Sequence, residues 1–218
     1  MKNIIIYGSG GHAKVIADII EKDNKYSILG FIDDTKTRNE MIVGYPVLGD
    51  FFYLNEIKNY ISGIIIAIGD NYSRMTLTNK IKSSYPELPF IKSIHPQTTI
   101  GKNVTIGAGT VVMAGAIINP DTTIGEHCII NTNCSIDHDC KIGDFSAVFP
   151  GATIAGNVTI GRSTTIALGA KIIHQINIGD ETVIGAGSTV FSNIPSNVLA
   201  YGTPCKVVRK RTNEEKYL

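Results

Sequence analysis

The stretch from Ile124 to Gly161, IGEHCIINTNCSIDHDCKIGDFSAVFPGATIAGNVTIG, decides the fold because an aliphatic residue returns at every sixth position. The same step runs without a gap from Ile94 to Val190, and Ile or Val occupies each of these positions. Neither the 3.6-residue period of a helix nor the two-residue alternation of a single strand gives this spacing. A coil of three short strands joined by turns does, so the pattern predicts a parallel β-helix over residues 94–195.

A second column of small or β-branched residues follows four positions after each aliphatic residue, and we expect it to face inward as well. Cys128, Cys134 and Cys140 belong to this column and lie on successive walls of one coil, so we interpret them as packing residues and not as metal ligands. No disulfide framework is expected. Glycines that directly follow the aliphatic residue, such as Gly125 and Gly143, are expected to permit tight turns.

The first 93 residues have a different pattern. Buried strands are expected near 4–7, 28–32 and 64–68, and an amphipathic helix follows the first strand. Three strands are too few for the two βαβαβ halves of a full dinucleotide site. We therefore expect a half-Rossmann-like α/β domain at 1–93, suited to a ligand smaller than NAD, and a separate tail at 196–218 after the β-helix.

The turn GSGGHA at 8–13 satisfies the pattern G-x-G-x-x-A, in which glycines let a phosphate approach the N-terminus of a helix. Asp33 and Asp34 end the second strand and could accept a hydrogen bond from a hydroxyl or imide N–H. Gly69 follows the third strand, at the edge of the sheet where ligands of open α/β folds bind. The alternative, that these glycines only serve chain geometry, stays open.

The charge balance argues against nucleic acid and anionic membranes as partners. The chain has 20 Lys and Arg against 19 Asp and Glu, whereas binding to polyanions usually needs a cationic excess. No apolar run approaches the roughly 20 residues that span a bilayer. Strand-like sequence begins at Ile4 without a preceding signal-peptide pattern, so a cytoplasmic location is expected.

His138 is the candidate general base. It comes two residues after the inward Ile136, which places it in a turn and pointing outward, between Asp137 and Asp139. Carboxylates beside an exposed imidazole hold one tautomer and stabilise the cation, as proton abstraction from an amine or hydroxyl requires.

The other histidines of the repeat, His95, His127 and His174, are expected at the surface. A zinc site like that of β-helical carbonic anhydrases would need about three converging ligands. His127 and His138 are eleven residues apart, which puts them at different turn positions. A metal site is therefore disfavoured, and no metal is expected.

The hexapeptides, the turn GSGGHAKV, the segments FIDD and AIGDN, and the stretch NTNCSIDHDCKIGDFSAVFPGATIAGNVTIG together resemble the sugar O- and N-acyltransferase family that includes NeuD, PglD and PerB. The similarity covers nearly the whole chain. It implies a left-handed β-helix, a homotrimer, acetyl-CoA bound between neighbouring helices, and an N-terminal domain that holds a nucleotide-linked amino sugar.

The resemblance also implies roles for individual residues. His138 matches the base, Asp139 the acidic neighbour that raises its basicity, and Asn131 a residue at the acceptor end of the cleft. Ala147 replaces a histidine that relatives often carry as a CoA contact. The remaining matches are substrate positions Gly10, Gly11, His12, Asp33, Asp34 and Gly69, and acetyl-CoA positions Leu168 and Ala186.

The tail YGTPCKVVRKR at 201–211 resembles the loop with which these enzymes cover CoA, and its four cations suit phosphates. The expected activity is N-acetylation of a UDP-4-amino-4,6-dideoxy type of sugar by direct transfer. Two alternatives stay open: O-acetylation of sialic acid or another sugar, as in NeuD, and a non-catalytic trimeric module that only binds sugar nucleotides.

Overall fold

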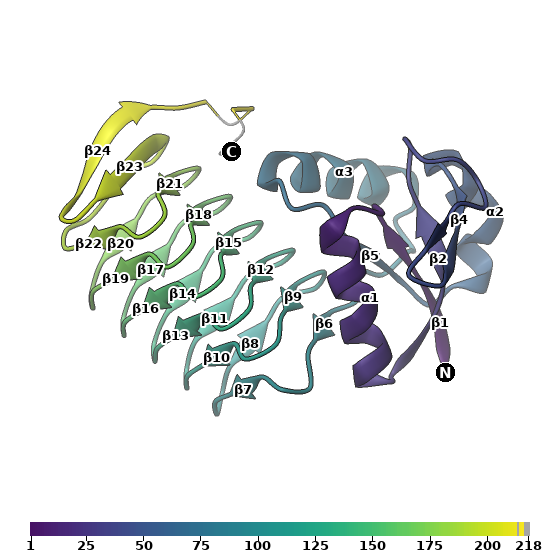
Figure 1. The fold of residues 1–218 in the computed structure, drawn as a ribbon, viewed down its shortest axis with the longest axis horizontal. Coiled ribbons are helices and arrows are strands. Elements are labelled where there is room, and N and C mark those ends of the chain that lie inside the picture. The colour runs from purple at the N-terminus through teal and green to yellow at the C-terminus, as the bar shows by residue number, and fades with distance from the viewer. Residues whose placement is uncertain (213, 216–218) are drawn as a thin grey trace. The chain divides into compact units, whose positions relative to one another are not determined.

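The computed structural model describes residues 1–212, 214 and 215. The chain divides into two compact units, Met1–Pro96 and Gln97–Leu218, which are drawn in Figure 1. The first is an α/β unit and the second a left-handed parallel β-helix, which confirms the fold class predicted from the sequence.

The first unit is built on a five-stranded sheet of order β3-β4-β2-β1-β5. All its pairings are parallel except the short antiparallel pair β3-β4. The three predicted strands are present, whereas β3 and β4 were not predicted. The elements are β1 (Lys2–Tyr7), α1 (Gly11–Asp23), β2 (Tyr26–Ile32), β3 (Met41–Ile42), β4 (Tyr45–Gly49), η1 (Phe51–Tyr53), α2 (Leu54–Ile57), η2 (Lys58–Tyr60), β5 (Ile64–Ile66), α3 (Asn71–Ser84) and β6 (Ser93–Ile94).

Strand β1 lies between β2 and β5 in this sheet and is buried on both faces. Successive side chains of a strand point to opposite faces, yet Ile4, Ile5 and Ile6 all have no exposed surface. A parallel strand covered on both sides is a continuous apolar run of this kind. The glycine turn after β1 therefore starts from a fully buried strand.

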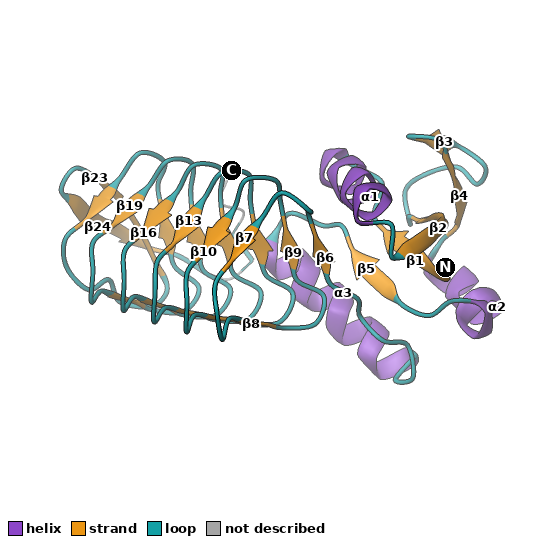
Figure 2. Ribbon diagram, turned by 90° about the horizontal axis from the view of Figure 1, so that it is seen from below, coloured by secondary structure: helices purple, strands orange, loops and turns teal. Residues whose placement is uncertain are grey.

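The second unit winds through three sheets, each holding one strand from every coil. Figure 2 shows one of them as a row of parallel arrows labelled from β7 to β19. We call them sheets 1, 2 and 3. Sheet 1 contains β7 (Thr99–Ile100), β10 (Ile117–Ile118), β13 (Ser135–Ile136), β16 (Thr153–Ile154), β19 (Lys171–Ile172) and β22 (Thr189–Val190). Sheet 2 contains β8 (Thr105–Ile106), β11 (Thr123–Ile124), β14 (Lys141–Ile142), β17 (Thr159–Ile160) and β20 (Asn177–Ile178). Sheet 3 contains β9 (Val111–Val112), β12 (Ile129–Ile130), β15 (Ala147–Val148), β18 (Thr165–Ile166), β21 (Val183–Ile184), β23 (Val198–Gly202) and β24 (Cys205–Lys210).

The register confirms the eighteen-residue coil. Ile118 pairs with Ile136, and Ile136 pairs with Ile154 on the next coil. The stacked aliphatic residues form the buried core except at the start of the coil, where Ile94 and Ile106 are half-buried and Ile100 is 40% exposed. Ile100 lies in β7, the edge strand of sheet 1, so no further strand of that sheet covers it.

The second inward column does more than fill space, because its hydroxyl and thiol groups join consecutive coils. Oγ1 of Thr122 receives the backbone N–H of Cys140 at 3.2 Å and donates to the carbonyl of Asp137 at 2.8 Å. Thr164 repeats the arrangement with Thr182 and Gly179. Cysteine takes part as a donor, since Sγ of Cys140 lies 3.2 Å from the carbonyl oxygen of Ala155.

The glycines after the aliphatic residues are needed for a reason other than the one expected. The left-handed backbone conformation occurs two residues later in the turn, for example at Asn103 (φ 60°) after Gly101 and at Phe145 (φ 59°) after Gly143. A Cβ on Gly125 would instead lie 2.3 Å from Oδ1 of Asp144 on the next coil. These glycines allow neighbouring coils to approach closely.

An antiparallel pair of strands, β23 and β24, follows the last coil and extends sheet 3. None of the helices in residues 1–212 and 214–215 is long and apolar enough to cross a lipid bilayer.

Candidate functional site

The turn between sheets 1 and 2, which we call edge A, carries His138. Its side chain is 52% exposed, and its Nδ1 atom lies 2.7 Å from Oδ2 of Asp139. Asp139 reaches this position because its own backbone is left-handed, and its N–H donates to the carbonyl of Pro120 at 3.1 Å. The imidazole therefore faces outward beside a carboxylate, as the spacing predicted.

Hydrogen bonding to Asp139 raises the pKa of His138 above its ordinary value, and the charges of Asp137 and Asp139 add to this effect. With Nδ1 engaged by the carboxylate, Nε2 is the nitrogen able to accept a proton from a reacting group. Nε2 lies over Gly156 of the next coil, where an added Cβ would be 2.7 Å away. The spacing of 18 residues between His138 and Gly156 was available in the sequence as a signal for this contact.

Asn131, Leu168 and Ala186 lie on a different edge, between sheets 3 and 1, which we call edge B. The amide oxygen of Asn131 accepts the N–H of Thr132 at 2.8 Å, while Leu168 is 52% exposed. Within one chain, the structure thus groups His138 with Asp139 and groups Asn131 with the two acetyl-CoA candidates. Ala147, in β15, is fully buried and offers only a methyl group.

The prediction that the other histidines of the repeat lie at the surface was wrong for two of them. His127 has no exposed surface and stacks on Phe145, with ring centroids 5.1 Å apart and planes 2° apart. Gly109 makes room for it, because a Cβ there would lie 2.3 Å from Nδ1 of His127. His95 is also buried, at 5% exposure, whereas His174 is exposed as expected.

The cysteines of the repeat are buried free thiols. Burial raises the pKa of Cys134 to about 12, so this thiol is unreactive as a nucleophile at neutral pH. Within residues 1–212 and 214–215, no three His, Cys, Asp or Glu side chains are grouped in a way that could hold a metal ion.

The β1–α1 turn places Gly10 and Gly11 at the start of a helix. No atom lies within 4 Å of a Cβ added to either glycine, so the space above them is open. Gly10 caps α1 without a side-chain hydrogen bond, and the first turn contains no acidic residue. An anion is favoured at such an end, because backbone amides and the helix dipole both point toward it.

His12 lies in the first turn of α1, and its Nε2 atom is buried without a hydrogen-bond partner. Burial, together with the positive charge of Arg74, lowers the pKa of His12 to about 4. The imidazole is therefore neutral at physiological pH and can donate or accept a hydrogen bond without carrying charge.

Asp33 and Asp34 follow β2, and both carboxylates are anchored within the unit. Asp33 accepts hydrogen bonds from the backbone and hydroxyl of Ser9 and of Thr35, at 2.6 to 2.9 Å. Burial alone would raise the pKa of Asp33, but these bonds bring it below its ordinary value. Asp34 accepts from the hydroxyl of Tyr7 and the N–H of Phe51, both at 2.8 Å.

These carboxylates border a cavity of about 430 Å³ at the carboxyl end of β2. Its wall also includes Lys36, Tyr53 and Arg38, whose guanidinium carbon lies 4.8 Å from the centre of the Tyr53 ring. The cavity thus combines both signs of charge with an aromatic face. Its aromatic and cationic residues were not singled out from the sequence.

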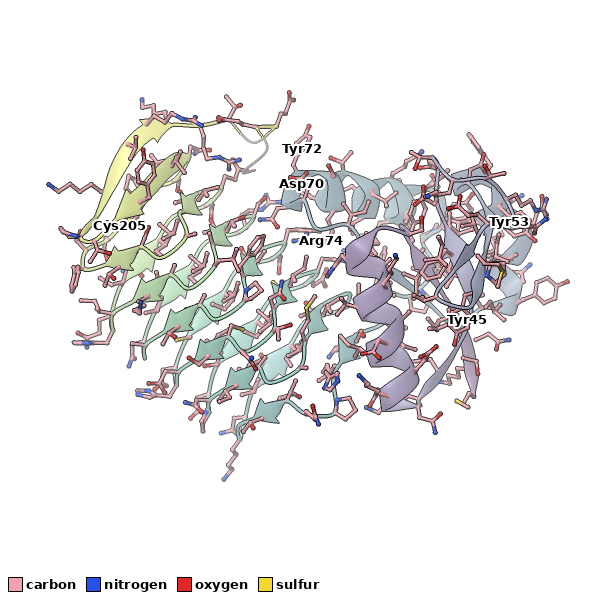
Figure 3. All side chains as sticks on the ribbon, viewed as in Figure 1. Tyr45, Tyr53, Asp70, Tyr72, Arg74 and Cys205 are labelled. Carbon is pink, nitrogen blue, oxygen red and sulfur yellow. The ribbon has the colours of Figure 1, made fainter. Side chains whose placement is uncertain are left out.

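Arg74 is the most important residue of this unit that the sequence did not reveal. It is only 1% exposed, and its Nη1 atom donates to the carbonyls of Ile68 and Gly69 at 3.0 and 2.8 Å. Asp70 caps α3 by accepting the N–H of Ser73 at 2.8 Å. Asp70 and Arg74 are labelled near the start of α3 in Figure 3. Side chains at the start of α3 thereby hold the turn that contains Gly69.

The predicted CoA-covering tail is described only in part, since residues 213 and 216–218 lie outside the described part of the chain. Two of its four cations have partners within the chain: Arg209 pairs with Glu215, and Arg211 donates to the carbonyls of Glu181 and Glu215.

Comparison with known protein families gives two matches. Residues 3–81 match the family described as PglD N-terminal domain, and residues 97–138 match the family described as bacterial transferase hexapeptide (six repeats).

Solved structures resemble the whole chain. PerB from Caulobacter crescentus, in complex with CoA and GDP-perosamine, is 33% identical, with 96% of this chain and 98% of that chain covered and a TM-score of 0.89. The acetyltransferase domain of PglB from Neisseria gonorrhoeae FA1090, in complex with acetyl coenzyme A, is 30% identical, with 95% and 99% covered and a TM-score of 0.87.

A shorter match is found with the UDP-N-acetylbacillosamine N-acetyltransferase of Bacillus subtilis (strain 168). It is 37% identical over 109 residues, which are 47% of this chain and 47% of that protein. The match thus spans about half the length of that relative.

Proposed function

The chain belongs to the sugar O- and N-acyltransferase family of hexapeptide-repeat enzymes, and from this we propose that it transfers the acetyl group of acetyl-CoA to the amine of a nucleotide-linked amino sugar. The acceptor class that we favour is a 4-amino-4,6-dideoxy sugar on UDP or another nucleoside diphosphate. The single observation that carries the proposal is the exposed His138 imidazole, oriented by Asp139 at 2.7 Å.

In the proposed reaction the sugar amine attacks the thioester carbonyl directly, without an acyl-enzyme. The new C–N bond forms as Nε2 of His138 takes the proton of the amine, and the C–S bond then breaks. The proton passes from His138 to the departing thiolate, which leaves as CoA. The negative charge of Asp139 stabilises the imidazolium that exists between these steps, and proximity lowers the barrier further.

The oxyanion of the tetrahedral intermediate needs a hydrogen-bond donor at edge A. We assign this role to the backbone N–H of Gly156. This glycine directly underlies the His138 ring, and its N–H donates to no other group in the described part of the chain. A donor fixed in the backbone needs no rearrangement as charge develops.

The nucleotide sugar is proposed to bind to the domain at 1–93. The open space above Gly10 and Gly11 at the start of α1 suits the pyrophosphate, and His12 adds a neutral hydrogen-bonding group there. The cavity beside Asp33 and Asp34 is large enough for further parts of the nucleotide. Gly69 lies in the turn that Arg74 holds.

We further propose that the enzyme is a homotrimer. His138 lies on edge A, whereas Asn131, Leu168 and Ala186 lie on edge B of the same chain. A cleft that contains all of them forms only if edge A of one protomer faces edge B of its neighbour. Acetyl-CoA would lie in this cleft, under the tail at 196–218, with Ala147 supplying no polar contact. A cytoplasmic location suits both substrates.

The test is thiol release from acetyl-CoA in the presence of UDP-, GDP- and dTDP-linked 4-amino sugars, with sialic acid as the O-acetylation arm. We expect turnover with at least one amino sugar and none with its 4-hydroxy counterpart. His138→Ala should lower kcat by ~10²-fold or more. His174→Ala is the matched control, since His174 is exposed at the same turn position two coils later. Binding of nucleotides without thiol release from any acceptor would instead support the non-catalytic module.

A further inference from the structure

The side chain of Asp137 links the preceding coil to the backbone of His138. Its Oδ1 atom accepts the side-chain N–H of Asn119 at 2.8 Å and the backbone N–H of His138 at 2.8 Å. Asn119 stands 18 residues before Asp137, directly beneath it in the preceding coil, because the strands before them pair Ile118 with Ile136. One carboxylate oxygen therefore fixes the candidate base relative to the coil below.

The carboxylate stays ionised while it does so. Hydrogen bonding from Asn119, followed by that from the His138 backbone, lowers the pKa of Asp137. Hydrogen bonds to an ionised acceptor are stronger than those between neutral groups. The link between Asn119 and His138 is thus more than an incidental surface contact.

The other polar groups of His138 are also held. Its carbonyl accepts the N–H of Asn157 at 3.0 Å, and Nδ1 is bonded to Asp139. Asp137 supplies the remaining restraint, on the backbone N–H. Two of these contacts restrain the backbone of His138 and the third restrains its ring, whose Nε2 atom lies over Gly156.

We propose that Asp137, anchored by Asn119, is a positioning residue for the catalytic histidine. It holds the His138 backbone so that Nε2 stays aimed at the site where the proton is removed. The inference rests on the proposed function, in which His138 is the base. A purely structural role, in which the pair only ties two coils together, is the reading that the experiment has to exclude.

The same edge offers a matched control. Nδ2 of Asn103 donates to Oδ1 of Asp121 at 2.8 Å, again across 18 residues, but no hydrogen bond of this pair reaches His138 within the described residues. Asn103→Ala and Asn119→Ala remove the same kind of bond between coils. Only the second disturbs the anchor of the base. Asn103→Ala also puts alanine at a left-handed backbone position (φ 60°), a stability cost that unfolding measurements record separately.

The kinetic experiment compares Asn119→Ala, Asp137→Ala, Asp137→Asn and Asn103→Ala, using the amino-sugar nucleotide that turns over in the acceptor panel. We expect Asp137→Ala to lower kcat by about 10- to 100-fold, because small displacements of a catalytic group have effects of this size. KM for both substrates should change little. Asp137→Asn should keep most of kcat, since its amide oxygen can accept both bonds. Combining Asn119→Ala with Asp137→Ala should lower kcat no further than Asp137→Ala does.

An unchanged kcat in Asp137→Ala would overturn the proposal, and so would an equal loss of kcat in Asn103→Ala. Urea unfolding of each variant separates lost stability from lost positioning. Imidazole NMR of the unliganded protein gives a readout that does not depend on turnover. We expect Asp137→Ala to alter the tautomer balance of His138, and Asp137→Asn and Asn103→Ala to leave it unchanged. The pKa of His138 should fall in both Asp137 variants, because the Asp137 charge contributes to raising it, so the tautomer balance alone reports positioning. If no acceptor is acetylated, the proposed function fails, while the NMR result still decides whether Asp137 positions the ring.

Discussion

A methyl group added to Gly156 would lie 2.7 Å from both the Cε1 and the Nε2 atoms of His138. These two residues stand 18 positions apart, so the ring of one coil lies over the turn of the next. The missing side chain at 156 is therefore part of the geometry of the proposed base.

Gly156→Ala should displace the His138 ring and lower kcat by ~10²-fold, with smaller effects on KM. Alanine is compatible with the backbone here, because Gly156 does not have a positive φ angle. Steady-state kinetics together with thermal unfolding provide the measurement. Full activity in a variant that folds normally would mean that the ring does not need its present position.

Asp139→Asn should shift the pH profile. The base must be unprotonated, and Asp139 raises the pKa of His138, so the acidic limb of kcat/KM is expected above the usual histidine value of about 6.5. Removing the carboxylate charge should move this limb to lower pH and lower the plateau, since a weaker base remains. Asparagine also tolerates the left-handed backbone at this position. A limb that moves upward or stays in place would contradict the assigned role.

Thr164→Val tests the hydroxyl links between coils. Oγ1 of Thr164 donates to the carbonyl of Gly179 at 2.8 Å and accepts the N–H of Thr182 at 3.2 Å. Valine fills the same space but leaves these buried groups unsatisfied, so the free energy of unfolding should fall by about 1–3 kcal/mol. Urea denaturation is the measurement. Thr159→Val, on the exposed face of sheet 2, is the control and should stay within about 0.5 kcal/mol of the parent protein.

Arg74→Met should raise KM for the nucleotide sugar by about tenfold or more, equivalent to about 1.4 kcal/mol, while kcat changes less. The reason is that the carbonyls of Ile68 and Gly69 lose their shared donor. The pKa of His12 should also rise from about 4, because the Arg74 charge contributes to lowering it. Arg74→Lys keeps the charge and should keep that pKa low, even where it cannot replace both hydrogen bonds. An unaltered His12 titration in Arg74→Met would refute the electrostatic link.

The six-residue period was sufficient to predict the β-helix, its inward columns and the outward position of His138. Each of these depends on the six-residue register, which is visible in every copy of the repeat. The burial of His127 depends on a contact with Phe145 one coil later and on the space left by Gly109. A residue at a turn position carries no local sign of such a partner.

In the α/β unit, the carboxyl-end turns could be predicted because glycine and aspartate mark them. The burial of Arg74 could not be predicted, since an arginine in a helix is usually exposed. It is buried because it binds carbonyls in a turn that only the folded chain brings near. The short strands β3 and β4 have only two and five residues, too few to establish an alternating pattern.

The strict register of the β-helix also restricts how such a chain can change in length. Inserting or deleting eighteen residues beyond the turn that carries His138 would add or remove one coil and return every later side chain to its former edge. A change of six would rotate all that follows by one wall, and Leu168 and Ala186 would then leave the edge that they share with Asn131. Functional variants of this protein that differ in length should therefore differ by whole coils of eighteen residues, or only in the segments outside the β-helix.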